Sequence, residues 1–445
     1  MLIGLEAMIS STVRQAHPGG RRRQRAGQRA GQRAGRRARR ICALWLSGPL
    51  LPLLVPELAR AQDHPVEMPE TLVEGLEPKG IRLGSVIALP RVNFDLRYDD
   101  NIYNRPDKVS DGVAVVRPAL ALQTDLPRHS LRLDARAEAR RYFDTPQENS
   151  RQWSLAGSTR LDFAERITLT LDSGIARRIE RRGTYGDQFF TDRPVAFIDK
   201  NVSARIAQTG GVIEWQASIG TQKVDYRDAL QSGVRVDQSF RDVRRDSMAV
   251  QVEYRRSTKL GVFVRAVGTR LVYDLGRERN SRGFSVLGGV TYRITDLVSM
   301  EAGVGYVKQN IRDPQRPDVS AVDYRVKFSW TPTPRARLEL DGARTVERSP
   351  LALGATILQS SLVASGSLAV GSRTLVGLEV GFLNNDYNGF DRRETRLQGE
   401  FTVSHKLTPN VAAFAGLSGR HQRGSGVTPR EYDGFAARIG ARIAI

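Results

Sequence analysis

The last fourteen residues, from Tyr432 to Ile445, constrain the fold of this chain more than any other feature. Apolar side chains occupy every second position there, and the chain stops on one of them: Phe435, Ala437, Ile439, Ala441, Ile443 and Ile445. A period of two is typical of a β-strand with one face in an apolar medium and the other in a polar one. The pattern therefore predicts the closing strand of an outer-membrane barrel. The residues of this row that we expect barrel assembly machinery to bind are Phe435, Ile439, Ile443 and Ile445.

The first 61 residues are predicted to be an export signal rather than part of the fold. A basic region with ten arginines (21–40) precedes an apolar run (41–55), and small residues follow at Ala59 and Ala61. These three features make a secretory signal peptide, with cleavage expected between Ala61 and Gln62. The paired arginines also resemble a twin-arginine signal, but that motif is incomplete. We expect a periplasmic lead-in over 62–80 and a barrel over 81–445.

The charge of the chain argues against nucleic acid as a partner. The formal net charge is +20, but the first 61 residues carry twelve Arg and two Glu, so removing them leaves +10. An export signal explains the basic, glycine-interleaved segment better than a nucleic-acid site does. Cys42, the only cysteine, lies within the signal, so the mature chain has neither a thiol nor a disulfide.

Alternation recurs along the mature chain and predicts a large antiparallel barrel. It is clearest over 91–98, 153–163 and 322–330, and weaker over 167–171, 213–219, 248–254, 284–294, 298–306, 376–382 and 397–403. Tight turns are expected at 126–130, 164–166, 209–211, 257–259, 295–296, 331–334, 371–373 and 408–410. Long polar loops are expected at 99–111, 144–151, 178–198, 223–245, 274–282, 310–320, 346–356, 384–393 and 420–431. Short periplasmic turns alternating with long extracellular loops are typical of outer-membrane barrels, and the pattern predicts about eighteen strands, with sixteen as the lower count.

A soluble β-sandwich is the alternative fold, because its strands also alternate. A sandwich of this length would need several domains, and no Pro- or Gly-rich linker separates any. Aromatic residues near predicted strand ends instead suit the girdles of a membrane barrel. They are Tyr98, Phe143, Trp153, Phe163 and Trp330.

Charged side chains on the polar face of the strands are predicted to line the lumen. They are Arg91, Asp95, Arg97, Arg160, Asp162, Asp323, Arg325 and Lys327. Such residues either brace the wall through ion pairs or set a transverse field across a wet channel. Four further arginines lie at a predicted extracellular strand end, where they would contact lipopolysaccharide phosphates or simply be solvated. They are Arg177, Arg178, Arg181 and Arg182.

No catalytic, metal or cofactor motif is found in the sequence. The mature histidines, His64, His129, His405 and His421, show no metal-ligand spacing, and nucleotide and hydrolase signatures are missing. Asp99, Asp100 and Asn101 offer oxygen ligands for Ca²⁺, but a turn-forming cluster explains them better.

The segment from Arg91 to Asn104, RVNFDLRYDDNIYN, resembles the first strand of a known family. Tyr98, Asp99, Asp100 and Asn101 are similar to the signature of the "putative beta-barrel porin 2" group, and Tyr142-Phe143 and Leu161-Asp162-Phe163 also resemble it. The resemblance implies an outer-membrane porin. Because members accompany exopolysaccharide or capsule genes, it also implies polysaccharide export components as partners. One departure is the C-terminal Ile445, where such barrels usually end on Phe or Trp.

Three functions remain open from the sequence. The first is a porin-like channel for small polar solutes or glycans in the outer membrane of a Gram-negative bacterium, in contact with lipopolysaccharide. The second is a non-conducting barrel that docks a polysaccharide secretion system. The third is a barrel hydrolase, although an enzyme is not expected.

Overall fold

The computed structural model describes residues 80–187, 191–295, 297–350 and 356–445. The predicted signal peptide, with Ala59, Ala61 and Gln62, lies outside these ranges, as does all but the last residue of the predicted lead-in. No helix in the described part of the chain is long and apolar enough to cross a membrane.

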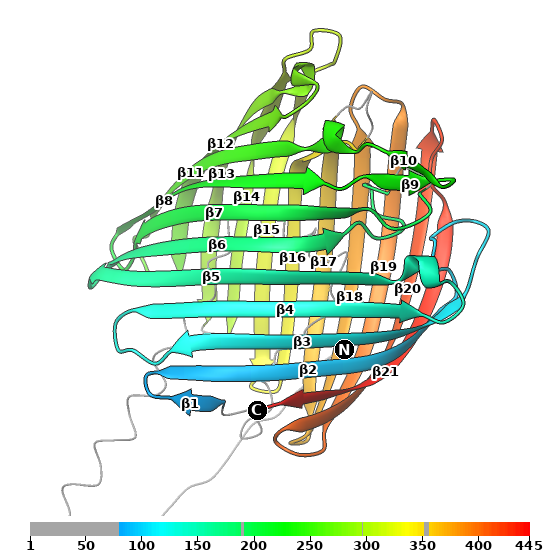
Figure 1. Cartoon of the computed structure of the whole chain (residues 1–445). Helices are drawn as coiled ribbons and strands as arrows, with labels where there is room; N and C mark the ends of the chain where they lie inside the picture. Colours follow the sequence, from blue (N-terminus) through cyan, green and yellow to red (C-terminus); the bar gives the residue numbers. More distant parts are fainter. Residues whose placement is uncertain (1–79, 188–190, 296, 351–355) are drawn as a thin grey trace, which may run out of the picture. The chain divides into compact units, whose positions relative to one another are not determined.

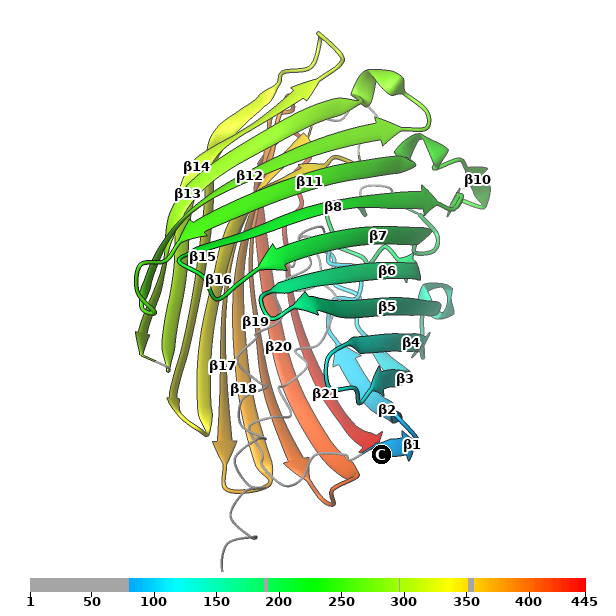
Figure 2. The same cartoon turned by 90° about the vertical axis from the view of Figure 1, so that its left-hand side faces the viewer.

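Eighteen antiparallel strands close into a barrel. The first, β2 (Val86–Asp99), pairs on one side with β3 (Asp111–Thr124) and on the other with the last, β21 (Tyr432–Ala444). Figures 1 and 2 show the sheet curving round until β21, in red, lies beside β2, in blue. The seam pairs Arg91 with Ala444 and continues to Asp99 opposite Ala436. The predicted closing role of the C-terminal strand is therefore confirmed.

The strands between β3 and β21 follow one another around the barrel in chain order. They are β4 (Ser130–Tyr142), β5 (Ser150–Ala164), β6 (Ile167–Ile179), β7 (Ala196–Gln208), β8 (Ile213–Tyr226), β11 (Val243–Tyr254), β12 (Leu260–Tyr273), β13 (Ser281–Thr295), β14 (Val298–Ile311), β15 (Val319–Thr333), β16 (Ala336–Arg348), β17 (Thr356–Val370), β18 (Thr374–Tyr387), β19 (Arg392–Lys406) and β20 (Val411–Gly426). The predicted count of eighteen is correct. Each predicted turn and loop includes a junction between two of these strands, but several strands extend into the predicted connections, as β15 does to Thr333 and β20 to Gly426.

Several small elements were not predicted. A short strand, β1 (Ile81–Leu83), pairs with the start of β2, so the wall itself begins at Val86. The hairpin of β9 (Ala229–Gln231) and β10 (Val234–Val236) forms a separate sheet in the loop after β8. A single-turn 3₁₀ helix, η3 (Ser239–Arg241), follows the hairpin in the same loop. Two more among the described residues, η2 (Pro146–Glu148) and η4 (Arg277–Arg279), lie in other loops.

The barrel is apolar outside and charged inside, the reverse of a soluble protein. On β2 the outward side chains of Val92, Phe94 and Leu96 are 42–44% exposed, while the inward Asp95 is fully buried. All five predicted girdle aromatics are exposed. A row of exposed aliphatic and aromatic side chains on every strand would be unstable in water, and it matches an apolar surrounding medium. The sandwich alternative is excluded because the sheet closes on itself.

Candidate pore constriction

The eight predicted lumen charges all lie on the inner face of the wall, and most are ion-paired there. Arg97 contacts Asp99 at 2.9 Å, Arg160 contacts Asp162 at 3.0 Å, Arg325 contacts Glu301 at 3.3 Å and Lys327 contacts Asp341 at 3.1 Å. Asp95 pairs with Arg117, and Asp323 accepts a hydrogen bond from Ser285. Arg91 also faces inward, opposite Ala119 of β3. The pairs of Asp95, Arg325 and Lys327 bridge neighbouring strands, whereas those of Arg97 and Arg160 lie within one strand. Both signs of charge face the interior.

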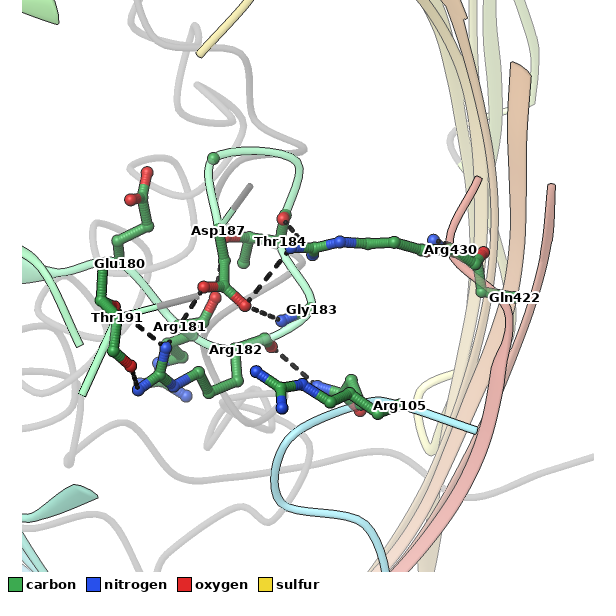
Figure 3. A network of polar contacts seen from close by, with 12 residues as sticks. Arg105, Glu180, Arg181, Arg182, Gly183, Thr184, Asp187, Thr191, Gln422 and Arg430 are labelled. Carbon is green, nitrogen blue, oxygen red and sulfur yellow. Dashed lines mark hydrogen bonds and ion pairs between the residues drawn. The ribbon is translucent and has the colours of Figure 1, made fainter. Parts of the chain in front are cut away.

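The loop between β6 and β7 folds into the barrel and reaches the opposite wall. β6 pairs only with β5 and β7, yet residues of the loop bond to β19, to the loop after β20 and to the loop after β2. Arg396 of β19 donates to the Gly183 carbonyl, and Arg430 donates to the Thr184 carbonyl at 3.2 Å. Figure 3 shows the loop facing Arg430, on the far ribbon, across the intervening space. The loop therefore narrows the lumen.

Arg182 fastens the base of this loop. Its guanidinium contacts Glu148 of η2 at 2.7 Å and Asp187 at 3.4 Å, and its side chain is only 7% exposed. Burial lowers the pKa of Arg182, but the Glu148 and Asp187 carboxylates outweigh that effect and hold the pKa above its usual value. An ion pair buried on both sides is costly to break, because removing one partner leaves an uncompensated charge. The loop is therefore held in one position.

Gly183 allows the chain to turn at the point of closest approach. Its φ is +79°, a left-handed conformation that favours glycine, and a Cβ there would lie 2.5 Å from the Asn104 amide nitrogen. Asn104 donates from that nitrogen to the Arg182 carbonyl at 2.7 Å. A larger residue at 183 would push the loop away from the wall.

A second set of contacts fixes the other side of the loop. Arg241 of η3 is ion-paired with Glu180 and lies 3.9 Å from the centre of the Tyr226 ring. Burial lowers the pKa of Arg241, but the Glu180 carboxylate more than compensates, so the pKa is raised. Burial, followed by the Glu347 carboxylate, raises the pKa of Tyr185 near the tip of the loop. The loop thus has strong polar contacts on both sides of the barrel.

The returning end of the loop is attached to the β9–β10 hairpin. Asp192 accepts hydrogen bonds from the backbone N–H groups of Ser232 at 2.9 Å and Gly233 at 2.8 Å. The Gly233 and Ser232 bonds lower the pKa of Asp192. The Asp192 N–H donates in turn to the Leu230 carbonyl at 2.7 Å.

Comparison with known families identifies the family to which this barrel belongs. The family model described as "Putative beta-barrel porin 2" matches residues 74–444. The chain belongs to this porin family. The match spans the whole described barrel, so the resemblance to this family is confirmed. No curated protein matches the sequence.

Solved structures similar to this porin include three from Pseudomonas aeruginosa. The outer membrane protein opdK is 12% identical, with 80% of this chain and 99% of that chain covered and a TM-score of 0.42. OpdO is 10% identical, with 81% and 97% covered and a TM-score of 0.42. A mutant of the ferric enterobactin receptor is 8% identical, with 80% of each chain covered and a TM-score of 0.43.

The family signature lies at the seam where the porin closes. Asp99 accepts from Arg420 of β20 at 2.6 Å, and the Phe435 N–H of β21 donates to Asp100 at 2.6 Å. Asn101 is fully buried and donates to the Asp433 carbonyl at 2.7 Å. The Asn101 N–H donates to the Asp99 carboxylate at 3.1 Å, which forms the expected turn. The oxygens that we considered for Ca²⁺ therefore bind guanidinium and backbone groups.

The prediction that four arginines contact lipopolysaccharide is wrong for three of them. Only Arg177 lies on the outer face, opposite the exposed Trp153. Arg178 faces inward and contacts Asp199 at 3.4 Å, and Arg181 contacts Glu138 at 3.2 Å inside the barrel. Arg178 follows Arg177 on β6, so strand alternation turns it to the inner face. β6 ends at Ile179 and the chain then turns inward, so Arg181 and Arg182 follow the loop and not the strand.

The described histidines have partners that do not form a catalytic triad. His405 lies 2.9 Å from the Thr374 hydroxyl, and His421 contacts Asp433. His129 accepts from the Asp162 N–H at 3.2 Å. Within the described residues, no histidine bonds to both a carboxylate and a hydroxyl. His64 lies outside those residues.

Proposed function

We propose that this porin is a diffusion channel of the outer membrane of a Gram-negative bacterium, without catalytic activity, for small polar solutes. The observation that carries the proposal is the β6–β7 loop, which crosses the interior and is fastened to the far wall by Arg396 and Arg430. A barrel of sixteen to eighteen strands encloses more space than its own side chains fill. A fixed loop then sets the size of the solute that passes.

The charged inner face supports a wet lumen. Opposite charges such as Lys327 and Asp341 lie 3.1 Å apart and remain partly exposed, at 25% and 35% of their side chains. Water or a polar solute is the medium that such side chains prefer. Glycans belong to the same class of solute, and the family resemblance makes polysaccharide export components candidate partners within this proposal. Lipopolysaccharide and the barrel assembly machinery are the other partners that we propose.

Solute uptake by liposomes tests this function. Purified, heat-modifiable protein should make liposomes permeable to monosaccharides and much less permeable to large oligosaccharides, because the loop narrows the lumen. Liposomes with heat-denatured protein are the control. If liposomes with the folded protein take up no monosaccharide, the proposal of a channel is contradicted and the docking alternative is favoured. Hydrolysis of phospholipid or glycan by the same preparation would support the third alternative.

A further inference from the structure

A cavity of about 150 Å³ lies between the β6–β7 loop and the inner wall formed by β18 to β21 and β2 to β4. Its lining has six arginines and three carboxylates. The arginines are Arg97, Arg117, Arg140, Arg181, Arg420 and Arg438, and the acids are Asp95, Glu379 and Glu400. Five of the arginines come from five strands of the wall, while Arg181 comes from the constricting loop.

Shared carboxylates hold the guanidinium groups in place without neutralising all of them. Glu138, which is 8% exposed, contacts Arg117 at 2.7 Å, Arg140 at 2.7 Å and Arg181 at 3.2 Å. Asp95 also pairs with Arg117, so two carboxylates face three guanidiniums at this point. Each guanidinium has five N–H donors, and one carboxylate can satisfy only some of them. The cavity therefore has more guanidiniums than carboxylates in its lining.

The strand register places like charges opposite each other beside the cavity. Arg97 of β2 and Arg438 of β21 are directly paired across the seam. Like charges directly opposite destabilise a sheet. The Asp99 carboxylate is ion-paired with Arg97 at 2.9 Å and with Arg420 at 2.6 Å, so two guanidiniums share its one negative charge. Glu400 pairs with Arg438, so two carboxylates face these three guanidiniums. An anion placed among them would offset the positive charge that remains.

We propose that this cavity is a binding site for the oxyanion group, carboxylate or phosphate, of a small solute on its way through the channel. Planar guanidiniums bind both groups through paired N–H donors. The volume is small compared with that of ordinary ligand pockets, so the site holds one charged group while the rest of the solute stays in the lumen. This inference deepens the proposed function and rests on it for its physiological meaning, although binding is measurable without transport.

Calorimetry on the detergent-solubilised, heat-modifiable protein tests the site, with inorganic phosphate and succinate as probes. The two titrations distinguish a phosphate ligand from a carboxylate ligand, and binding of either probe supports the proposal. Arg140→Gln should weaken binding about tenfold or more, because it removes charge-assisted donors while Arg117 and Arg181 still pair with Glu138. The matched control on the same strand is Arg132→Gln, which removes an inward arginine paired with Asp134 at 2.7 Å outside the cavity.

A second variant, with the opposite expected effect on binding, tests the site if Arg140→Gln does not fold. Glu379→Gln removes a carboxylate from the lining and should strengthen binding several-fold. The site is overturned if neither probe binds the folded wild type, or if Arg140→Gln and Arg132→Gln bind equally well. Uptake of neutral sugars without anion binding would refute the site and leave the channel standing. Anion binding without any uptake would refute the channel and leave the site standing.

Discussion

Deleting residues 436–445 is expected to abolish insertion into the membrane. β21 bonds to β20 on one side and to β2 on the other, and the deletion removes most of both ladders. The two neighbouring strands would then present open edges to lipid, where each unsatisfied backbone group costs several kcal/mol. We expect no heat-modifiable band in the outer-membrane fraction, and degradation of the truncated chain in the periplasm.

The control for this truncation is a deletion of similar length away from the wall. The β9–β10 hairpin is a separate sheet in the loop after β8, so its removal opens no edge of the barrel. A chain without 229–236 should still give the heat-modifiable band. If the chain without 436–445 also gives that band, the closing strand is dispensable for insertion. That result would contradict the claim that the pairing of β2 with β21 closes the barrel.

Excising the constricting loop is expected to raise conductance several-fold while the barrel stays intact. Ile179 and Ala196 are already paired, and the Glu180 N–H donates to the Val195 carbonyl at 2.8 Å. Residues 181–194 can therefore be replaced by Asn-Gly, which favours a two-residue hairpin turn. The excision removes Arg181 and Arg182 with their contacts across the lumen, so the narrowest point should widen.

A shortened β14–β15 loop is the comparison for this excision. Residues 313–317 are mostly exposed, and their removal should leave single-channel conductance unchanged. Equal conductance of the wild type and the 181–194 excision would mean that the β6–β7 loop does not limit the pore. Loss of heat-modifiability would instead mean that its ion pairs are needed for folding, and Arg182→Gln would then serve as a milder variant.

The wall of the barrel was predictable because strand alternation and turn spacing are local properties. Outward rows such as Val92, Phe94 and Leu96 identify the face toward the apolar medium without any tertiary information. Alternation was weak in 195–208, 260–273 and 411–419, yet β7, β12 and β20 form there because both neighbours supply pairing partners. Tertiary pairing overrides a weak local pattern.

The interior was less predictable because it depends on contacts between distant residues. Arg182 meets Glu148 only because a loop turns inward at Gly183, and no sequence period encodes that turn. The composition of the loop does not distinguish it from a solvated loop, since arginines, Asp187 and glycines are ordinary there. The same arginines at a strand end suggested a lipid contact instead.

The most direct test of the constricted channel is the single-channel current of the purified wild-type protein in planar lipid bilayers. We expect discrete, reversible conductance steps of one main size, because the β6–β7 loop fixes the narrowest point of every molecule. Protein that migrates as a heat-modifiable barrel and inserts into the bilayer, yet produces no steps over a wide range of voltage, would contradict the channel.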